Sequence, residues 1–371
     1  MKNFKVLSKP KEIFKNMLED IRYAQKSIYL ETYIYENDKI GNLFLKALEK
    51  KARQGVKVFV LIDALGSGSA RTFLHKTIGI KNALGLTLGA DKNYFRNLRK
   101  AGGKVRFFKE IRYAVRWFGQ NHERNHRKLL IIDRKISYIG SVNITSACLD
   151  WRELVLRLEG DISGDFVISF AAHWRLAGKI TRKKINLILH KGFEIIQDIP
   201  SDAKMITADR YIKLIRSAKK EILIETPYFV PPITIRKALS RAVEKGVQVK
   251  LLIPCKSDLG ILDIIRNRYL GRLYMKGIKI YYYLPRNLHS KLLIIDDKFF
   301  ILGSSNLDYR ALIHQYEINL LGKNKKIISE LRKFFNSGLK QSKPFDYREF
   351  KSRSSFTKLA ELIVSLVENY L

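Results

Sequence analysis

The chain contains an internal repeat, and this repeat constrains the fold more than any other feature. The hexapeptide KLLIID occurs at residues 128–133 and again, letter for letter, at residues 291–296. The match extends to both sides, because six residues of the first copy recur 163 positions later. The pairs are His126 and His289, Lys128 and Lys291, Asp133 and Asp296, Gly140 and Gly303, Ser141 and Ser304, and Asn143 and Asn306. A repeat of this kind predicts two copies of one structural unit.

Looser matches precede the repeated motif in both halves. Residues 24–35 resemble residues 218–229, and residues 55–63 resemble residues 246–254. The offset between matched positions falls along the chain, so the first half carries extra residues, most of them at 64–98 and 108–126. We interpret these two stretches as surface insertions and as candidates for loops that cover a substrate.

The same order of elements is predicted in both halves. Residues 27–35 and 221–229 are rich in β-branched and aromatic residues and predict strands, whereas 40–54 and 234–245 have helical periodicity and stop at a glycine. The KLLIID segments fit strands that are buried on both faces. The sequence therefore predicts an α/β protein with two similar α/β/α sandwich domains, residues 1–198 and 199–371, related by a pseudo-two-fold axis, with the active site at their interface.

Two further segments bear on membrane attachment. Nowhere do 18 uncharged apolar residues run together, so we expect no membrane-spanning helix. No apolar core follows the lysines at the N-terminus, so we expect no secretion signal. Residues 356–371 form an amphipathic segment that either docks on its own domain or lies on a membrane surface. Its apolar face is made up of Phe356, Leu359, Ile363, Leu366 and Tyr370.

The charge of the chain indicates a polyanionic partner. There are 70 Lys and Arg residues against 35 Asp and Glu residues, a formal net charge of +35. Nucleic acid and acidic phospholipid are the two candidates, and charge alone does not choose between them. Trp117 and Phe118 lie in a basic stretch and are interpreted either as interfacial anchors or as core aromatics.

The repeated polar residues suit chemistry on a phosphodiester. Within a strand, residues two apart point to the same side, so His126 would lie beside Lys128 and His289 beside Lys291. The lysines supply positive charge, and Ser141, Asn143, Ser304 and Asn306 supply hydrogen-bond donors for phosphate oxygens. Two such sets facing each other would enclose one phosphate.

Imidazole can act as nucleophile or as general acid near neutral pH, so one histidine can form a phosphohistidine while the other protonates the leaving alkoxide. This chemistry needs no metal and no cofactor. Each imidazole needs a carboxylate on its other nitrogen, and Glu153 and Glu317 lie at matching places in the two halves.

The remaining acidic and histidine positions allow two interpretations. Asp133 and Asp296 complete the repeated motif and join the candidate catalytic set, although their place at strand ends favours hydrogen bonds to the backbone. Glu31 and Glu225 either line the cleft or form structural ion pairs. The other histidines have no counterpart in register and are predicted to be surface or packed residues: His75, His122, His173, His190 and His314.

The motif HxKxxxxD followed by GSxN, present twice, resembles the defining motif of the phospholipase D superfamily. Within that superfamily the chain is most similar to bacterial cardiolipin synthases, over nearly its whole length. The stretches that carry the resemblance begin at Arg124 (RNHRKLLIID), Trp151 (WRELVLRLEG), Glu225 (ETPYFVPP) and Gly303 (GSSNLDYRALIHQYEINL). The paired transmembrane helices that precede the catalytic region in many cardiolipin synthases are not found in this sequence, so it resembles the short type.

The resemblance implies an enzyme that transfers a phosphatidyl group between two phosphatidylglycerol molecules and releases glycerol. It also implies that His126 is the nucleophile and His289 the acid and base, although the pseudo-symmetry permits the reverse. We expect peripheral attachment to anionic phospholipid on the cytoplasmic side of the cell membrane. Two alternatives remain: a phosphodiesterase or nuclease that uses water as acceptor, and a non-catalytic module that binds membrane or nucleic acid.

Overall fold

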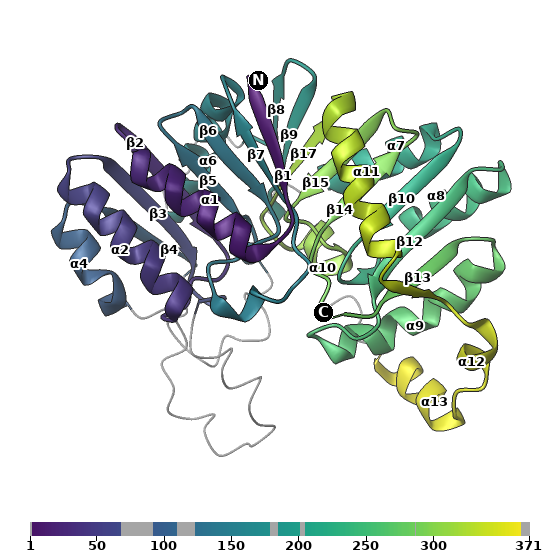
Figure 1. The fold of residues 1–371 in the computed structure, drawn as a ribbon. Helices are drawn as coiled ribbons and strands as arrows, with labels where there is room; N and C mark the ends of the chain where they lie inside the picture. The colour runs from purple at the N-terminus through teal and green to yellow at the C-terminus, as the bar shows by residue number, and fades with distance from the viewer. Residues whose placement is uncertain are drawn as a thin grey trace. The chain divides into compact units, whose positions relative to one another are not determined.

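The computed structural model describes residues 2–67, 92–109, 123–178, 185–200, 205–285 and 287–364. The chain divides into two compact units. The first comprises Met1–Leu149 and Val155–Ile188, and the second comprises Asp150–Leu154 and Leu189–Leu371. Each unit has a large β-sheet with helices on its faces (Figure 1).

The first unit is built on a seven-stranded sheet with the order β1-β7-β6-β5-β2-β3-β4. Helices α1 and α2 cover one face of the sheet and α6 the other, while α4 packs beside α2 (Figure 1). The strands are β1 (Asn3–Leu7), β2 (Ser27–Thr32), β3 (Lys57–Asp63), β4 (Lys104–Phe108), β5 (Leu129–Ile132), β6 (Ile136–Gly140) and β7 (Val155–Glu159). The helices are α1 (Pro10–Tyr23), α2 (Lys39–Arg53), α4 (Arg96–Lys100) and α6 (Ile162–Ala177).

The second unit has a nine-stranded sheet with the order β18-β13-β12-β10-β14-β15-β17-β9-β8 and a short parallel pair, β11 and β16. Its strands are β8 (Leu187–His190), β9 (Phe193–Asp198), β10 (Glu221–Glu225), β11 (Phe229–Val230), β12 (Gln248–Pro254), β13 (Lys279–Tyr283), β14 (Leu292–Ile295), β15 (Phe299–Gly303), β16 (Leu307–Asp308), β17 (Glu317–Gly322) and β18 (Ser342–Pro344). Its helices are α7 (Ile206–Ser217), α8 (Ile233–Glu244), α9 (Gly260–Met275), α10 (Tyr309–Ile313), α11 (Lys325–Leu339), α12 (Tyr347–Lys351) and α13 (Ser355–Val364).

The two sheets share one strand order, which confirms the predicted α/β fold with two similar halves. The run β7-β6-β5-β2-β3-β4 of the first sheet corresponds to β17-β15-β14-β10-β12-β13 of the second. In both, the strand made from KLLIID is central, and its four residues Leu-Leu-Ile-Ile are buried. Such a strand reads as a continuous apolar run because helices cover both of its faces.

The predicted helix ends are also confirmed. Asp38 caps α2 by accepting a hydrogen bond from the Gly41 backbone N–H at 2.9 Å. Helices α2 and α8 are each followed by a glycine in the left-handed region, Gly55 with φ 83° and Gly246 with φ 85°. The next strand of the sheet begins directly afterwards in both units.

The second unit begins earlier in the chain than the predicted boundary at residue 198. Strand β9 pairs antiparallel with β17, with Asp198 opposite Glu317, in the same way that β1 pairs with β7. Residues 187–198 therefore supply the last two strands of the second sheet, β9 and, at its edge, β8. The unit also takes in Asp150–Leu154 from the middle of the first half, which the repeat in the sequence does not indicate.

The expected insertions and the amphipathic C-terminal segment are described only in part. The insertions expected at 64–98 and 108–126 lie largely outside the described residues, as do Trp117, Phe118, His75, His122, Leu366 and Tyr370. Helix α13 packs on α9, yet Phe356, Leu359 and Ile363 of its predicted apolar face are exposed. Over the described ranges, none of the helices has the length and hydropathy needed to cross a bilayer.

Candidate active site

The two His/Lys pairs have the same local geometry, each within its own unit. His126 and Lys128 lie just before β5, and His289 and Lys291 lie just before β14, so neither pair is inside a strand as the spacing argument assumed. In each pair the lysine Nζ donates back to the histidine carbonyl oxygen, at 2.5 Å in the first unit and 2.6 Å in the second. All four side chains are buried. The repeat thus fixes each ammonium group beside its imidazole through the backbone.

In the second unit, the His289 ring is held by a carboxylate. Its Nδ1 lies 2.9 Å and 3.1 Å from the two oxygens of Glu153, a fully buried side chain, and the rings of Trp151 and His289 pack in an edge-to-face arrangement. Burial lowers the pKa of His289, although the Glu153 charge opposes this shift. Because Glu153 engages Nδ1, Nε2 is the nitrogen that can exchange a proton or a phosphoryl group.

Glu153 reaches His289 because residues 150–154 belong to the second unit. The backbone carbonyl of Arg152 accepts from the N–H groups of His289, at 2.9 Å, and of Ser290, at 3.0 Å. The Arg152 guanidinium forms an ion pair with the buried Glu225, with Nε 2.7 Å from Oε1, and donates to the Phe334 carbonyl at 2.6 Å. Glu225 therefore forms a structural ion pair. This pair fixes Arg152, the residue next to Glu153.

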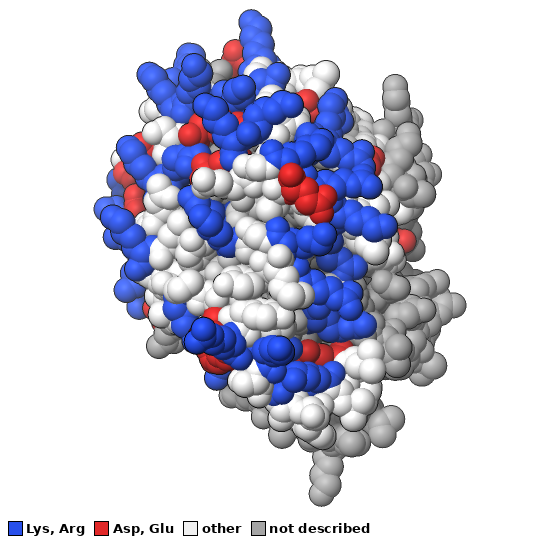
Figure 2. Space-filling view, turned by 90° about the vertical axis from the view of Figure 1, so that its right-hand side faces the viewer, with Lys and Arg blue, Asp and Glu red and all other residues white. Residues whose placement is uncertain are grey.

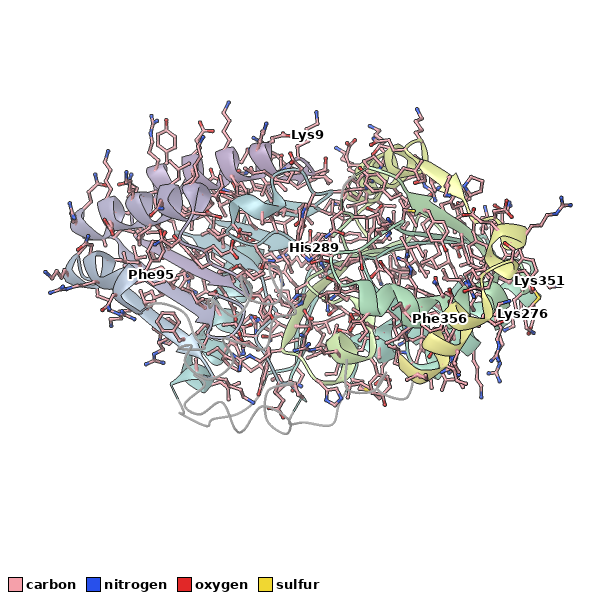
Figure 3. All side chains as sticks on the ribbon, turned by 90° about the horizontal axis from the view of Figure 1, so that it is seen from below. Lys9, Phe95, Lys276, His289, Lys351 and Phe356 are labelled. Atoms are coloured by element: carbon pink, nitrogen blue, oxygen red, sulfur yellow. The ribbon has the colours of Figure 1, made fainter. Side chains whose placement is uncertain are left out.

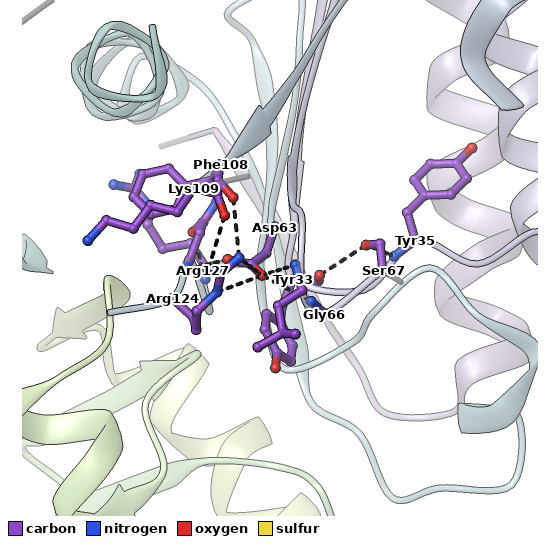
Figure 4. Close-up of polar contacts among 11 residues, drawn as sticks. Tyr33, Tyr35, Asp63, Gly66, Ser67, Phe108, Lys109, Arg124 and Arg127 are labelled. Carbon is purple, nitrogen blue, oxygen red and sulfur yellow. Dashed lines mark hydrogen bonds and ion pairs between the residues drawn. The ribbon is translucent and has the colours of Figure 1, made fainter. Parts of the chain in front are cut away.

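The segment before His126 in the first unit has a different anchor (Figure 4). The Arg124 guanidinium lies 2.8 Å from Asp63 at the end of β3, and both side chains are fully buried. Asp63 also accepts from the Asn125 N–H at 2.8 Å and from the Gly66 N–H at 3.0 Å. A buried carboxylate with this many donors fixes residues 124 and 125 and hence the position of His126.

Glu31 also takes part in a buried structural network. It accepts a hydrogen bond from Asn125 at 3.1 Å, lies 3.3 Å from the Arg127 Nε, and contacts His173 Nδ1. Burial raises the pKa of Glu31, but Arg127 and His173 outweigh that effect, so its pKa is below the usual value. Burial lowers the pKa of His173, which packs in the core as predicted for histidines outside the repeat.

The carboxylates of Asp133 and Asp296 accept hydrogen bonds from backbone N–H groups of their own units. Each has positive φ, 53° in both cases, and is the first residue of the three-residue hairpin loop that follows the Leu-Leu-Ile-Ile strand. The Asp133 carboxylate accepts from three successive N–H groups at 25–27, at 2.7 to 2.9 Å, and Asp296 accepts from those at 219–221, at 2.7 to 2.8 Å. This geometry favours the backbone role over direct contact with a substrate.

The serine and asparagine residues after the motif lie in strand-end loops. Ser304 donates to the buried carboxylate of Glu317 and accepts from the Ile318 N–H at 2.9 Å. Asn143 Oδ1 accepts from the Ile34 N–H at 3.3 Å, and Ser141 is fully buried. Asn306 is also buried, and its Oδ1 has no hydrogen-bond partner among the described residues.

Lys291 supplies a buried positive charge beside His289 in the second unit. Burial lowers its pKa to about 8, while the carboxylates of Glu153, Glu317 and Asp308 act in the opposite direction. The group therefore remains mainly protonated at neutral pH. A buried ammonium of this kind stabilises a bound phosphate anion strongly because water does not screen it.

Sequence reasoning missed Arg152, Asp63 and Arg124 as residues that hold the site. Arg152 and Arg124 stand inside stretches that resemble cardiolipin synthases, next to Glu153 and His126, so the resemblance marked their neighbourhood without giving their roles. Asp63 aligns with Pro254 in the repeat and so had no counterpart to draw attention to it.

Comparison with known proteins identifies the family of the chain. The family model described as "Cardiolipin synthase, PLD-like domain" matches residues 17–174 and 211–339. The chain belongs to this family. The cardiolipin synthase of Clostridium perfringens (strain SM101) is 31% identical over 96% of this chain and 74% of its own length. The major cardiolipin synthase of Bacillus subtilis (strain 168) is 30% identical over 99% of this chain and 75% of its own length.

A solved structure supports the fold. Phosphatidylserine synthase from Haemophilus influenzae Rd KW20 superposes with a TM-score of 0.76 at 16% identity and covers 99% of this chain and 95% of its own. The likeness confirms the predicted fold, and the family membership confirms the resemblance on which the expected activity was based.

Proposed function

We propose that this protein is a cardiolipin synthase-like phosphatidyltransferase that converts two phosphatidylglycerol molecules into cardiolipin and glycerol. The observation that carries the proposal is the second unit's buried set, in which Glu153 holds Nδ1 of His289 and Lys291 is fixed beside the same histidine. A buried imidazole oriented by a carboxylate next to an ammonium group is suited to proton transfer at a phosphodiester. The named relatives of the chain support the choice of lipid substrate.

The proposed reaction has two displacements. Nε2 of His126 attacks phosphorus of the first phosphatidylglycerol, the bond from phosphorus to the glycerol oxygen breaks, and His289 gives its proton to that oxygen. His289 then removes the proton from a hydroxyl of the second phosphatidylglycerol. That oxygen attacks the phosphohistidine and releases His126 unchanged. The assignment of His126 as nucleophile follows the family resemblance.

The other repeated residues have supporting roles in this proposal. Lys128 and Lys291 neutralise the phosphate, and Ser141, Asn143, Ser304 and Asn306 donate to its oxygens. By the symmetry of the repeat, Glu317 does for His126 what Glu153 does for His289. Asp133 and Asp296 act on the backbone, as their contacts indicate.

We also propose that the protein works at the cytoplasmic surface of the cell membrane as a peripheral protein. The formal net charge of +35 favours attachment to a bilayer rich in anionic lipid. The two substrate molecules would then be taken from the same surface.

The test is a product assay with purified protein and phosphatidylglycerol vesicles. We expect cardiolipin and glycerol in equal amounts, and loss of both when His126 or His289 is changed to Ala. Protein denatured in alkali during turnover should carry a phosphatidyl group on His126 and not on His289, because the bond between phosphorus and imidazole nitrogen survives alkali but not acid. Release of phosphatidic acid without cardiolipin, or nicking of DNA, would replace the transferase by a phosphodiesterase. Turnover by both alanine variants would refute the mechanism.

A further inference from the structure

Helices α8 and α9 of the second unit border a surface groove of about 870 Å³. None of the candidate site residues is among the described residues that line it. Its lining includes Lys237 and Arg241 from α8, Arg268 and Arg272 from α9, and Lys276, which directly follows α9.

The groove is strongly basic. Arg268, Arg272 and Lys276 recur every four residues on α9, and Lys237 and Arg241 do so on α8, so each set forms a stripe along one side of its helix. All five side chains are exposed. Among the described residues that line the groove, Glu244 is the one acidic residue, and it is paired with Lys276 at 3.0 Å. Figure 2 views this side of the second unit and shows Lys and Arg around uncharged surface, with Asp and Glu covering less of the face than Lys and Arg do.

Exposed apolar side chains lie next to the basic stripes. Ile233 and Met275 line the groove and are 56% and 64% exposed. Helix α13, which Figure 3 draws in yellow with Phe356 labelled, adds four more exposed apolar residues. These are Phe356, Leu359, Leu362 and Ile363, which are 52–80% exposed.

The groove and α13 belong to one surface. The Arg268 charge acts on Glu361 of α13, which is paired with Arg353 at 3.1 Å. Tyr269 of the groove and Val364 at the end of α13 pack against the same buried cluster. Helix α13 therefore packs on α9 through the side that carries Glu361 and Val364. Its exposed apolar residues lie on the side turned away from α9.

We propose that this surface docks on a bilayer, with the groove binding the phosphate headgroups of anionic phospholipids and α13 inserting its exposed apolar residues among the lipid chains. Basic side chains beside exposed aliphatic ones are the composition of an interfacial membrane surface. Nucleic acid would gain the charge contacts, but it offers nothing to cover the exposed aliphatic side chains of α13. The inference rests on the peripheral attachment proposed above and deepens it by naming the surface that makes the attachment.

The first experiment removes charge from the groove. The variant Lys237→Gln, Arg241→Gln, Arg272→Gln is compared with Lys46→Gln, Lys50→Gln, Arg53→Gln, which removes three exposed basic residues from one side of α2. Each basic residue near an anionic bilayer contributes about a fivefold gain in binding. We expect the groove variant to bind vesicles of phosphatidylglycerol and phosphatidylcholine on the order of 100-fold more weakly at 0.1 M salt, and the α2 variant to change by less than about tenfold.

The second experiment tests the apolar part. Phe356→Ser combined with Leu362→Ser should weaken the binding that remains at high salt, where charge contacts are screened. Equal losses in the groove and α2 variants, or unchanged vesicle binding by the groove and α13 variants, would overturn the proposal. So would a DNA duplex that binds through the groove more tightly than the vesicles do. Turnover of phosphatidylglycerol dispersed in detergent should be the same in all three variants and the parent protein, which separates failure of this proposal from failure of the proposed function.

Discussion

The contacts of Arg152 predict a large loss of stability when its charge is removed. Arg152 makes an ion pair with Glu225 at 2.7 Å, and the two side chains are 8% and 0% exposed. In the variant Arg152→Met, the Glu225 carboxylate stays buried, and of its donors among the described residues Ser290 remains. Removing one partner of a buried ion pair costs about 3–5 kcal/mol. We expect the second unit to lose that much free energy of unfolding.

A double variant tests whether the unpaired charge is the cause. Glu225→Gln keeps an oxygen that can accept from Ser290 but removes the negative charge. Replacing a buried pair by uncharged groups of similar volume is close to neutral, so Arg152→Met with Glu225→Gln should recover most of the loss. Hydrogen exchange of second-unit peptides over a urea series measures this unit by itself.

The matched control is a similar pair at the surface. Arg210 lies 2.8 Å from Glu194 in the same unit, with both side chains more than a quarter exposed. Because water screens this pair, Arg210→Met should cost less than about 1 kcal/mol. A loss below about 1 kcal/mol for Arg152→Met, or a double variant as unstable as the single one, would refute the reasoning. The double variant should still turn over more slowly, because Arg152 also fixes residues 150–154 through the Phe334 carbonyl.

Three further predictions concern single groups. Burial lowers the pKa of His289 and the Glu153 charge raises it, so in Glu153→Gln the NMR titration of His289 should move to still lower pH; a move to higher pH would contradict the assignment. Since the pKa of Lys291 is about 8, substrate affinity should fall as the pH rises through that value, and Lys291→Arg should abolish this decline; a decline that persists would exclude Lys291 as its source. Asp296→Asn should destabilise the second unit by about 1–2 kcal/mol, with Asp297→Asn as the control. The pKa of Asp296 in the folded protein is below the usual 3.8, so its contribution to stability is complete above pH 3.8 and disappears as the pH falls through the folded-state pKa. A difference in stability between Asp296→Asn and the parent protein that persists in strong acid would refute this.

The repeat made most of the fold predictable. Two copies of KLLIID, each an apolar run too short for a helix, identified the central strand of each sheet. Gly55 and Gly246 identified the helix ends, because the chain turns there through positive φ. These are local signals, and they do not reveal a pairing that is decided by distant residues. Strand β9 is such a case, since its place depends on β17 about 120 residues later.

The candidate site was predictable in its residue types but not in its connections. His289 and Glu153 were both found from the repeat, yet the sequence did not show which histidine each glutamate serves. That depends on the stretch 150–154 joining the second unit through Arg152. The ion pairs Arg152–Glu225 and Arg124–Asp63 link residues far apart in sequence, with no periodic pattern to reveal them.

The differences between the two halves matter as much as their likeness. The proposed mechanism needs one imidazole to be neutral and the other protonated at the same time, and two identical surroundings would give both rings the same pKa. The repeat supplies the same lysine-to-carbonyl contact to both. The anchors differ, because position 63 is Asp where the second half has Pro254, and Arg124 corresponds to Asn287. The segment before His126 is thus fixed by a buried ion pair of its own, whereas the segment before His289 depends on residues 150–154, which also deliver Glu153. Divergence at these anchoring positions is a physical route by which a duplicated unit acquires two histidines with different roles.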